Sequence, residues 1–156
     1  MLPSHRELVD QLVRTIDIRL LDPLEILLDG DDGVDALRTV VRVRAETWAR
    51  RLLDEDDREV VGTVARILAT LYPGDCPFDP PLDWWGTPLG RVVARRVGHP
   101  TAASVSYTVA GAMLGITRQG VHDLVSRGKL TRHPEGGVLA SSVRDRLQTE
   151  GRSRRG

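Results

Sequence analysis

The sequence predicts a mainly α-helical protein. We expect an N-terminal helical bundle, then two helices that meet at a sharp turn, then a small β-hairpin. Three observations favour this fold class. Apolar residues recur at spacings of three and four through much of the chain, the charge changes sign near Gly98, and Gly115 interrupts an apolar helical pattern.

Charge divides the 156 residues into two parts. Residues 1–98 carry 13 Arg and 18 Asp or Glu, a net charge of −5, whereas residues 99–156 carry 9 Lys or Arg and 4 Asp or Glu, a net charge of +5. We therefore expect an acidic helical domain at 1–98, for dimerisation or partner binding, and a basic domain at 99–150. Residues 151–156 form a basic tail expected to be disordered. Such asymmetry indicates a polyanionic partner for the basic part.

Composition places the protein in the cytoplasm. The chain has no apolar run of about 18 residues, so no membrane span is expected. The N-terminal stretch MLPSHRELVDQ lacks the regions of a signal peptide. Cys76 is the single cysteine, which excludes an internal disulfide.

The N-terminal part reads as four or five helices. Ser4 and Glu7 form a capping box that opens the first helix, and Pro23 begins a short segment that Gly30 ends. A long helix is expected from Gly33, and the acidic run 54–57 opens the next one. The apolar stripe of the long helix consists of Val34, Leu37, Val41, Ala45, Trp48 and Leu52. This stripe and the Trp84–Trp85 pair suggest a homodimer through this domain.

A proline-rich loop follows, and a capped helix closes this part. Thr87 is an N-cap with Pro88 at the first helical position, and Gly98 ends that helix. Trp84 and Trp85 precede the cap. They pack the loop onto the bundle or form an interface between protomers, and stacking on single strands is the alternative we favour less.

Gly115 resolves the interrupted pattern as a corner between two short helices. A helix from Thr108 would end at Gly115, which adopts positive φ readily. Ile116 would then turn inward, and Thr117 would cap a second helix with Val121, Leu124 and Val125 on its inner face. This arrangement is a helix-turn-helix.

A hairpin and a last helix complete the basic part. Lys129 to His133 reads as a strand, PEGG at 134–137 as a turn, and Val138 to Ala140 as the return strand. Ser141 or Ser142 would cap the last helix. Helix, turn, helix, hairpin and helix is the order of a winged helix-turn-helix.

The segment from Thr108 to Leu147 resembles the DNA-binding domain of the MerR and excisionase-type winged helix-turn-helix families. The resemblance lies in LGIT at 114–117 and in LVSRGKL at 124–130. It implies that the second helix enters the major groove and that the wing touches the DNA backbone. Gly111 stands where these families usually carry alanine, and Gly120 lies inside the recognition helix, where it costs about 1 kcal/mol relative to alanine. Either Gly120 permits close approach of DNA or it is simply tolerated.

Two sets of residues are the expected contacts to double-stranded DNA. Arg118 and Gln119 lie in the first turn of the second helix, where bidentate contacts to guanine and adenine are available. His122 reaches a base or a phosphate, or is merely exposed, and Asp123 accepts from cytosine or, as we favour, orients Arg127. The expected recognition-helix set is Thr117, Arg118, Gln119 and His122, and the expected phosphate and wing set is Arg127, Lys129, Arg132 and His133.

We find no pattern for an enzyme, a cofactor or a metal site. The histidines lack metal-ligand spacing, and no phosphate-binding loop, dinucleotide fingerprint or nucleophile elbow is present. We expect a nucleoid-associated bacterial transcriptional regulator that acts as a dimer. The alternatives are an excisionase-like, partition or architectural DNA-binding factor, and a protein-interaction module such as an antitoxin.

Overall fold

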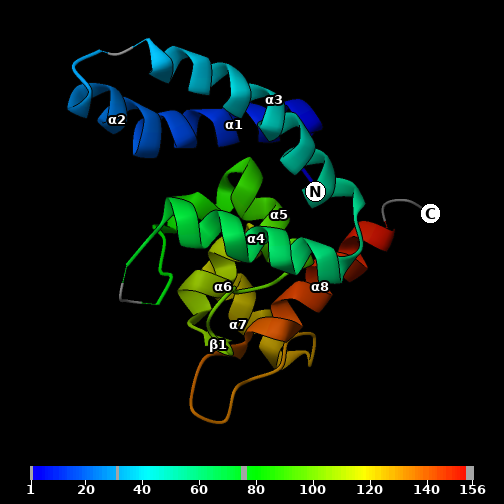
Figure 1. Ribbon diagram of the computed structural model, residues 1–156. Coiled ribbons are helices and arrows are strands. Elements are labelled where there is room, and N and C mark those ends of the chain that lie inside the picture. Colours follow the sequence, from blue (N-terminus) through cyan, green and yellow to red (C-terminus); the bar gives the residue numbers. More distant parts are fainter. Residues whose placement is uncertain (1, 31, 75–76, 154–156) are drawn as a thin grey trace. The chain divides into compact units, whose positions relative to one another are not determined.

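The computed structural model describes residues 2–30, 32–74 and 77–153. As expected, these residues are mainly helical, with a small two-stranded antiparallel sheet (Figure 1). Apart from the first two residues, the chain forms two compact units, Pro3–Pro73 and Gly74–Gly156, here called the N-terminal unit and the C-terminal unit. None of the helices in the described ranges combines the length and apolar character that a membrane span requires.

A helical hairpin begins the N-terminal unit. α1 (His5–Ile16) opens with the expected capping box, in which the Ser4 hydroxyl accepts from the Glu7 N–H and the Glu7 carboxylate accepts from the Ser4 N–H. A π-helical turn, η1 (Asp17–Leu21), leads into α2 (Asp22–Leu27). α3 (Gly33–Asp54) then runs back beside α1 (Figure 1).

The apolar stripe of α3 lies largely inside this unit. Val34, Ala45 and Leu52 are buried, and Val41 and Trp48 are half-buried. Leu37 differs from the prediction, since its side chain is 44% exposed. Burial removes most of this stripe from any dimer surface, so the stripe is core and not the interface that its periodicity suggested.

α4 (Asp57–Leu71) begins where the acidic run predicts a helix start. The Asp56 carboxylate accepts a hydrogen bond from the Glu59 N–H at 3.0 Å. Acidic side chains at a helix start also meet the positive end of the helix dipole. The acidic run therefore caps α4 and needs no metal ion to explain it.

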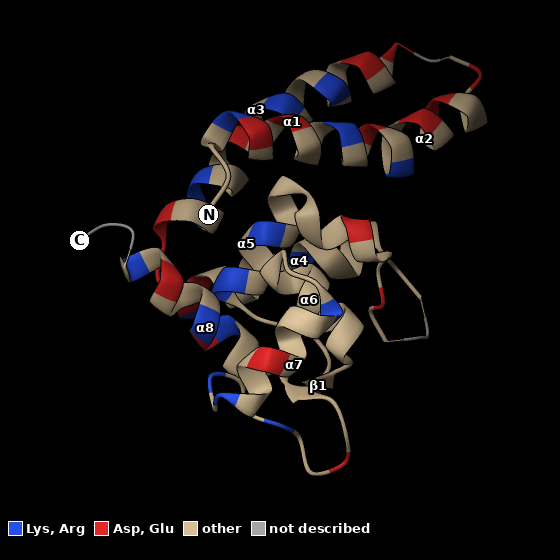
Figure 2. Cartoon of the chain, turned by 180° about the vertical axis from the view of Figure 1, so that it is seen from behind, with Lys and Arg blue, Asp and Glu red and all other residues tan. Residues whose placement is uncertain are grey.

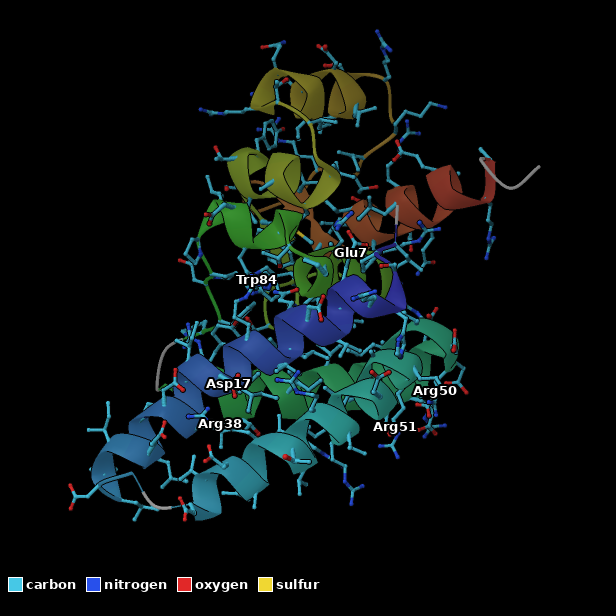
Figure 3. The ribbon with its side chains drawn as sticks, turned by 90° about the horizontal axis from the view of Figure 1, so that it is seen from above. Glu7, Asp17, Arg38, Arg50, Arg51 and Trp84 are labelled. Carbon is cyan, nitrogen blue, oxygen red and sulfur yellow. The ribbon has the colours of Figure 1, made fainter. Side chains whose placement is uncertain are left out.

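One arginine links α3 to the segment that follows α1. Arg38 lies within ion-pair distance of Glu25 at 2.7 Å, Asp22 at 3.0 Å and Asp17 at 3.4 Å, and Figure 3 shows Asp17 and Arg38 near each other on adjacent helices. The hydrogen bond to Glu25 raises the pKa of Arg38 above its ordinary value, against the opposing effect of burial. These carboxylates come from η1 and α2, so Arg38 helps to hold this irregular segment against α3.

The C-terminal unit contains more of the chain than the charge pattern predicts. η2 (Leu82–Gly86) and α5 (Pro88–Arg96) belong to it, together with β1 (Ser104–Val105), α6 (Tyr107–Leu114), α7 (Arg118–Ser126), β2 (Val138–Leu139) and α8 (Ala140–Ser153). α5 packs against α8, and η2 packs against α6. The boundary therefore lies between Pro73 and Gly74, not at Gly98. Apolar contacts decide which segments fold together, and the change in net charge along the sequence does not coincide with the boundary that these contacts define.

The tryptophan pair belongs to the core of the C-terminal unit. Trp84 and Trp85 are 8% and 1% exposed, and their rings meet edge to face at 5.0 Å. Phe78 packs edge-on against Trp84 at 5.2 Å. Their burial leaves no face for stacking on single strands or for a protomer interface. The expected packing role is confirmed, because η2 packs against α5, which was expected in the same bundle, and η2 packs against α6 as well.

The expected hairpin forms, and a further strand pairs with its return strand. The segment 129–133 is joined to the return strand by an antiparallel bridge between Arg132 and Val138. On either side of this bridge, the Leu139 N–H donates to the Thr131 carbonyl at 2.8 Å and the His133 N–H donates to the Gly137 carbonyl at 3.0 Å. β2 also pairs with β1, with Ser104 opposite Leu139 and Val105 opposite Val138. The sequence analysis assigned no strand to Ser104–Val105, because two residues carry too little periodicity to indicate a strand.

The last helix also differs from the prediction at both ends. α8 already begins at Ala140, and Ser142 donates its hydroxyl to the Leu139 carbonyl and accepts from the Thr131 N–H. Ser142 therefore ties the wing to α8. Residues 151–153 continue the helix and are not a disordered tail, and residues 154–156 lie outside the described ranges, as does Cys76.

Candidate nucleic-acid interface

The corner between α6 and α7 forms as the glycine pattern predicts. Ser106 caps α6, which begins at Tyr107, one residue before the expected start at Thr108. Gly115 ends the helix with φ of 73°. The Ile116 N–H then donates to the Gly111 carbonyl at 2.9 Å. This bond folds the chain back onto α6 and sets the direction in which α7 leaves the turn.

Two glycines let α6 and the turn approach each other closely. A Cβ atom added to Gly111 would lie 2.8 Å from the Ile116 carbonyl oxygen, a backbone atom with little freedom to move. A Cβ atom added to Gly120 would lie 3.3 Å from the Ile116 Cδ1 and 3.4 Å from the Thr117 hydroxyl. The packing of the turn against α6 therefore requires glycine at position 111. The direction in which a side chain at position 120 would point is toward Ile116 and Thr117 of the turn. That direction argues against a glycine reserved for close approach of DNA.

Ile116 does not fill the corner as expected. Its side chain is 40% exposed and lies beside Gly120. Val121 is fully buried and takes the inward position on α7. The exposed isoleucine thus adds an apolar spot at the start of the α7 surface.

Thr117 caps α7 as expected and so determines which side chains face outward. Its hydroxyl accepts from the Gly120 N–H at 3.0 Å. With Val121 inward, Arg118, Gln119 and His122 are all exposed. The structure therefore brings the four expected recognition-helix residues onto one exposed end of α7, with Thr117 at its start.

Asp123 pairs with Gln119 and not with Arg127. The Gln119 side-chain amide donates to the Asp123 carboxylate at 3.3 Å, one turn along α7. The bond between Arg127 and Asp123 is a backbone bond, in which the Arg127 N–H donates to the Asp123 carbonyl. The favoured pairing of Asp123 with Arg127 was therefore wrong. This bond uses one of the two N–H donors of the Gln119 amide, so the second N–H and the amide oxygen remain available for adenine N7 and N6.

His122 contacts an aromatic side chain that the sequence reasoning missed. The Tyr107 ring meets the His122 ring edge to face at 4.3 Å. Tyr107 is the first residue of α6, and the predicted helix began one residue later. The Ser106 cap is the signal that would have placed Tyr107 on this surface. The contact restricts His122, so it is not a freely solvated side chain.

Four residues were expected at the end of α7 and in the wing, and three of them are fully exposed. Arg127, Lys129 and Arg132 are exposed, and no ion pair or side-chain hydrogen bond joins them to other described residues. His133 is half-buried, and its Nδ1 accepts from the Glu135 N–H at 3.1 Å. His133 therefore stabilises the turn of the wing, and the three cations remain open to a partner.

Some cationic side chains of the C-terminal unit form ion pairs with described carboxylates, and others do not. The whole unit, residues 74–156, carries 12 Lys or Arg and 7 Asp or Glu, so its net charge stays at +5 with the boundary at Pro73. On α8, Arg144 pairs with Asp145 at 3.4 Å and Arg146 pairs with Glu150 at 3.2 Å. Figure 2 shows Lys and Arg in the loop after α7, apart from the mixed charges along α8. The excess positive charge near α7 is thus not neutralised by described neighbours.

A second histidine of this unit is structural. His99 Nδ1 accepts from the N–H groups of Thr101 and Ala102, and its ring packs 5.6 Å from Trp85. Burial lowers the pKa of His99 below its ordinary value, and Asp79 opposes this shift. Within the described ranges, no group of three His, Cys, Asp or Glu side chains has the geometry to hold a metal ion.

Comparisons with protein-family models, with curated proteins and with solved structures find no match to this chain. The likeness to the MerR and excisionase-type families therefore rests on the motif between Thr108 and Leu147 and on the local geometry of α6 and α7.

Proposed function

We propose that this chain is a sequence-specific double-stranded DNA-binding protein, a bacterial transcriptional regulator of the nucleoid, with a winged helix-turn-helix in its C-terminal unit. One observation carries the proposal. The Thr117-capped start of α7 presents Arg118, Gln119 and His122 outward, beside cations that no described residue neutralises. A helix that exposes such side chains at its N-terminal end matches the docking of recognition helices in the major groove.

Base recognition would fall to the first turn of α7. Arg118 offers paired donors to guanine O6 and N7, and Gln119 offers a donor and an acceptor to adenine. Each such contact is worth about 1–3 kcal/mol of discrimination. Asp123 accepts one of the two Gln119 amide N–H donors in the free protein and thereby orients this side chain.

Affinity without sequence preference would come from the residues after α7. Arg127, Lys129 and Arg132 are exposed cations, and each phosphate contact releases counterions, with a log–log salt slope of about −0.9 per contact. The repulsion expected of Asp123 is reduced because it accepts from Gln119. His133 is assigned to the wing turn and not to phosphate.

A binding-site selection followed by titrations of four variants tests this assignment. Arg118→Ala should weaken the selected duplex far more than a scrambled one. Lys129→Ala or Arg132→Ala should weaken both alike and reduce the salt slope by about one. Arg42→Ala, in α3 of the other unit, is the matched control for loss of one exposed arginine. If Arg118→Ala behaved like Lys129→Ala in both tests, the docking geometry would be wrong.

The same titration separates the alternatives. Failure of the wild-type chain to bind random duplexes at low salt would favour a protein-interaction module. A strong bend in the bound DNA, measured by fluorescence transfer between the duplex ends, would favour an excisionase-like or architectural factor. A regulator is instead expected to occupy few sites across the genome.

We also propose a homodimer through the N-terminal unit, because one small winged domain buries limited surface on DNA. The surface is the outer face of α3, on the side opposite its buried stripe. That face carries Ala36, Val40, Val43 and Thr47 at spacings of four, three and four, and Val40 and Val43 are 53% and 64% exposed. Such spacing lets two helices pack along a seam.

A second copy of this chain is the proposed occupant of this face. A two-fold interface uses the same apolar patch on both copies, and Val40 and Val43 supply such a patch. Charges of both signs border it: Asp35 lies near the start of α3, Arg50 lies in its second half (Figure 3), and Asp54 ends it.

Light scattering at micromolar concentration should give the mass of a dimer for the full chain. Val43→Glu should produce a monomer, because two carboxylates would meet at the seam. Val61→Glu, at a valine on α4 that is 44% exposed, is the matched control and should remain a dimer. A monomeric wild-type chain would refute the interface.

A further inference from the structure

The N-terminal unit contains a partly enclosed cavity of about 310 Å³ between its helices. We call it the N-terminal cavity. Its lining comes from α1, η1, α3 and α4: Leu12, Ile16, Leu20, Leu21, Val41, Trp48, Arg51, Thr63, Arg66, Ile67, Thr70 and Leu71. The volume lies at the lower end of the range for small-molecule sites, roughly 300–1,000 Å³.

Most of the cavity wall is apolar. α1 and η1 contribute aliphatic side chains. Trp48 of α3 and Ile67 of α4 pack against the buried apolar cluster that contains Leu71. Side chains around an unfilled space lose packing contacts, so a cavity of this kind is costly unless something occupies it. An apolar molecule of matching size would recover those contacts.

The polar part of the wall is limited to α3 and α4, and it carries only positive charge. Thr63, Arg66 and Thr70 follow one another at spacings of three and four on α4, and Arg51 of α3 also lines the cavity. Among the described residues, none that lines the cavity carries a carboxylate. Thr70 donates its hydroxyl to the Arg66 carbonyl and is therefore already occupied as a donor. Thr63 and the two arginines remain as the groups that would face a polar ligand atom.

The two arginines differ in how strongly their neighbours hold them. Arg51 lies 3.8 Å from the Glu55 carboxylate, and its side chain is 47% exposed, so this pair is weak. The Arg66 guanidinium forms no ion pair or hydrogen bond with another described residue. An anion at the mouth of the cavity would therefore be held mainly by Arg66, with Arg51 as the second contact.

We propose that the N-terminal cavity binds a small amphipathic anion, an apolar body with a single carboxylate, of the size of a medium-chain fatty acid. The apolar body lies among the aliphatic side chains and Trp48. The carboxylate meets the guanidinium groups of Arg66 and Arg51, which line the cavity and can form charge-assisted hydrogen bonds. Binding is a property of the N-terminal unit and does not depend on whether the C-terminal unit binds DNA.

Calorimetric titration of the full chain with decanoate and with decanol tests the proposal. Decanoate should bind saturably, one molecule per chain, and about tenfold more tightly than decanol, the ratio expected for one partly exposed charge-assisted bond. Arg66→Gln should remove this preference and leave decanol binding unchanged. Arg58→Gln is the matched control, because Arg58 is exposed on the same helix and does not line the cavity.

A series of chain lengths on the wild-type protein gives a readout that needs no variant. Affinity should rise from hexanoate to decanoate and fall again by hexadecanoate, because the cavity has a finite volume. Affinity that keeps rising with length would indicate detergent-like adsorption and overturn the proposal. So would equal effects of Arg66→Gln and Arg58→Gln, or no binding of decanoate at all.

Sedimentation velocity with and without decanoate distinguishes a ligand from a second copy in the cavity. The oligomeric state should stay the same, because the proposed dimer face of α3 is on the opposite side from Val41 and Trp48. Dissociation of a dimer by decanoate would assign the cavity to a partner chain and overturn the proposal.

Discussion

Replacement of Gly111 by alanine should destabilise the C-terminal unit, although alanine is the better helix former. The added Cβ atom would lie 2.8 Å from the Ile116 carbonyl oxygen, 0.6 Å short of the 3.4 Å at which ordinary contact begins. Relief of the overlap requires the turn to move away from α6. That movement also weakens the bond from the Ile116 N–H to the Gly111 carbonyl.

The expected loss follows from three terms. Overpacking of this kind costs about 1–3 kcal/mol, and the weakened hydrogen bond costs about 1 kcal/mol. The gain in helix propensity returns about 1 kcal/mol. The free energy of unfolding should therefore fall by about 1–3 kcal/mol. In a domain of this size, each kcal/mol lowers the midpoint temperature by about 4–8 °C.

Gly120→Ala is the matched control, because it makes the same chemical change nine positions further along. Its Cβ atom would meet the end of the Ile116 side chain at 3.3 Å, and that exposed side chain can move aside. The helix-propensity gain then remains, so this variant should be as stable as the wild type or more stable by up to about 1 kcal/mol.

Urea denaturation followed by tryptophan emission measures both variants. A Trp48→Phe background leaves Trp84 and Trp85 as the emitters, and both are buried in the C-terminal unit. Gly111→Ala should be less stable than Gly120→Ala by about 1–4 kcal/mol. Equal shifts would refute the close approach of α6 to the turn.

Three further outcomes are expected. Burial lowers the pKa of His99 below its ordinary value of about 6.5, so around and below that pH the unfolded chain binds more protons than the folded chain. Urea titrations should therefore show that the unfolding free energy of the C-terminal unit falls from pH 7.5 to 5.5. His99→Gln should make this fall smaller. A fragment of residues 74–156 should unfold cooperatively by circular dichroism, whereas residues 99–156 should not, because they lack Trp84, Trp85 and α5; equal cooperativity would restore the boundary at Gly98. Arg38→Met should speed amide hydrogen exchange in η1 and α2 more than in α4, and a uniform change would show that Arg38 does not hold that segment.

The sequence by itself determined the local features of both units. The Ser4–Glu7 capping box, the Asp56 and Thr117 caps and the positive φ of Gly115 all occur where the pattern predicts them. Each depends on residues at most a few positions apart. A side chain that accepts a backbone N–H three residues on needs no information from the rest of the fold. For the same reason Arg118 and Gln119 could be placed on the outer face of α7 from the cap and Val121 alone.

Only the tertiary structure decided which segments share a unit, which apolar face of α3 is buried and which strand completes the wing. β1 and β2 are separated by 32 intervening residues in the sequence, and the addition of Ser104–Val105 beside the hairpin depends on how α6 and α8 pack. Trp84 and Trp85 join the C-terminal unit because that unit buries them, although their segment carries acidic charge. Burial of apolar surface is non-directional and is gained from any neighbour that fits, so its outcome depends on all segments at once and not on any one sequence pattern.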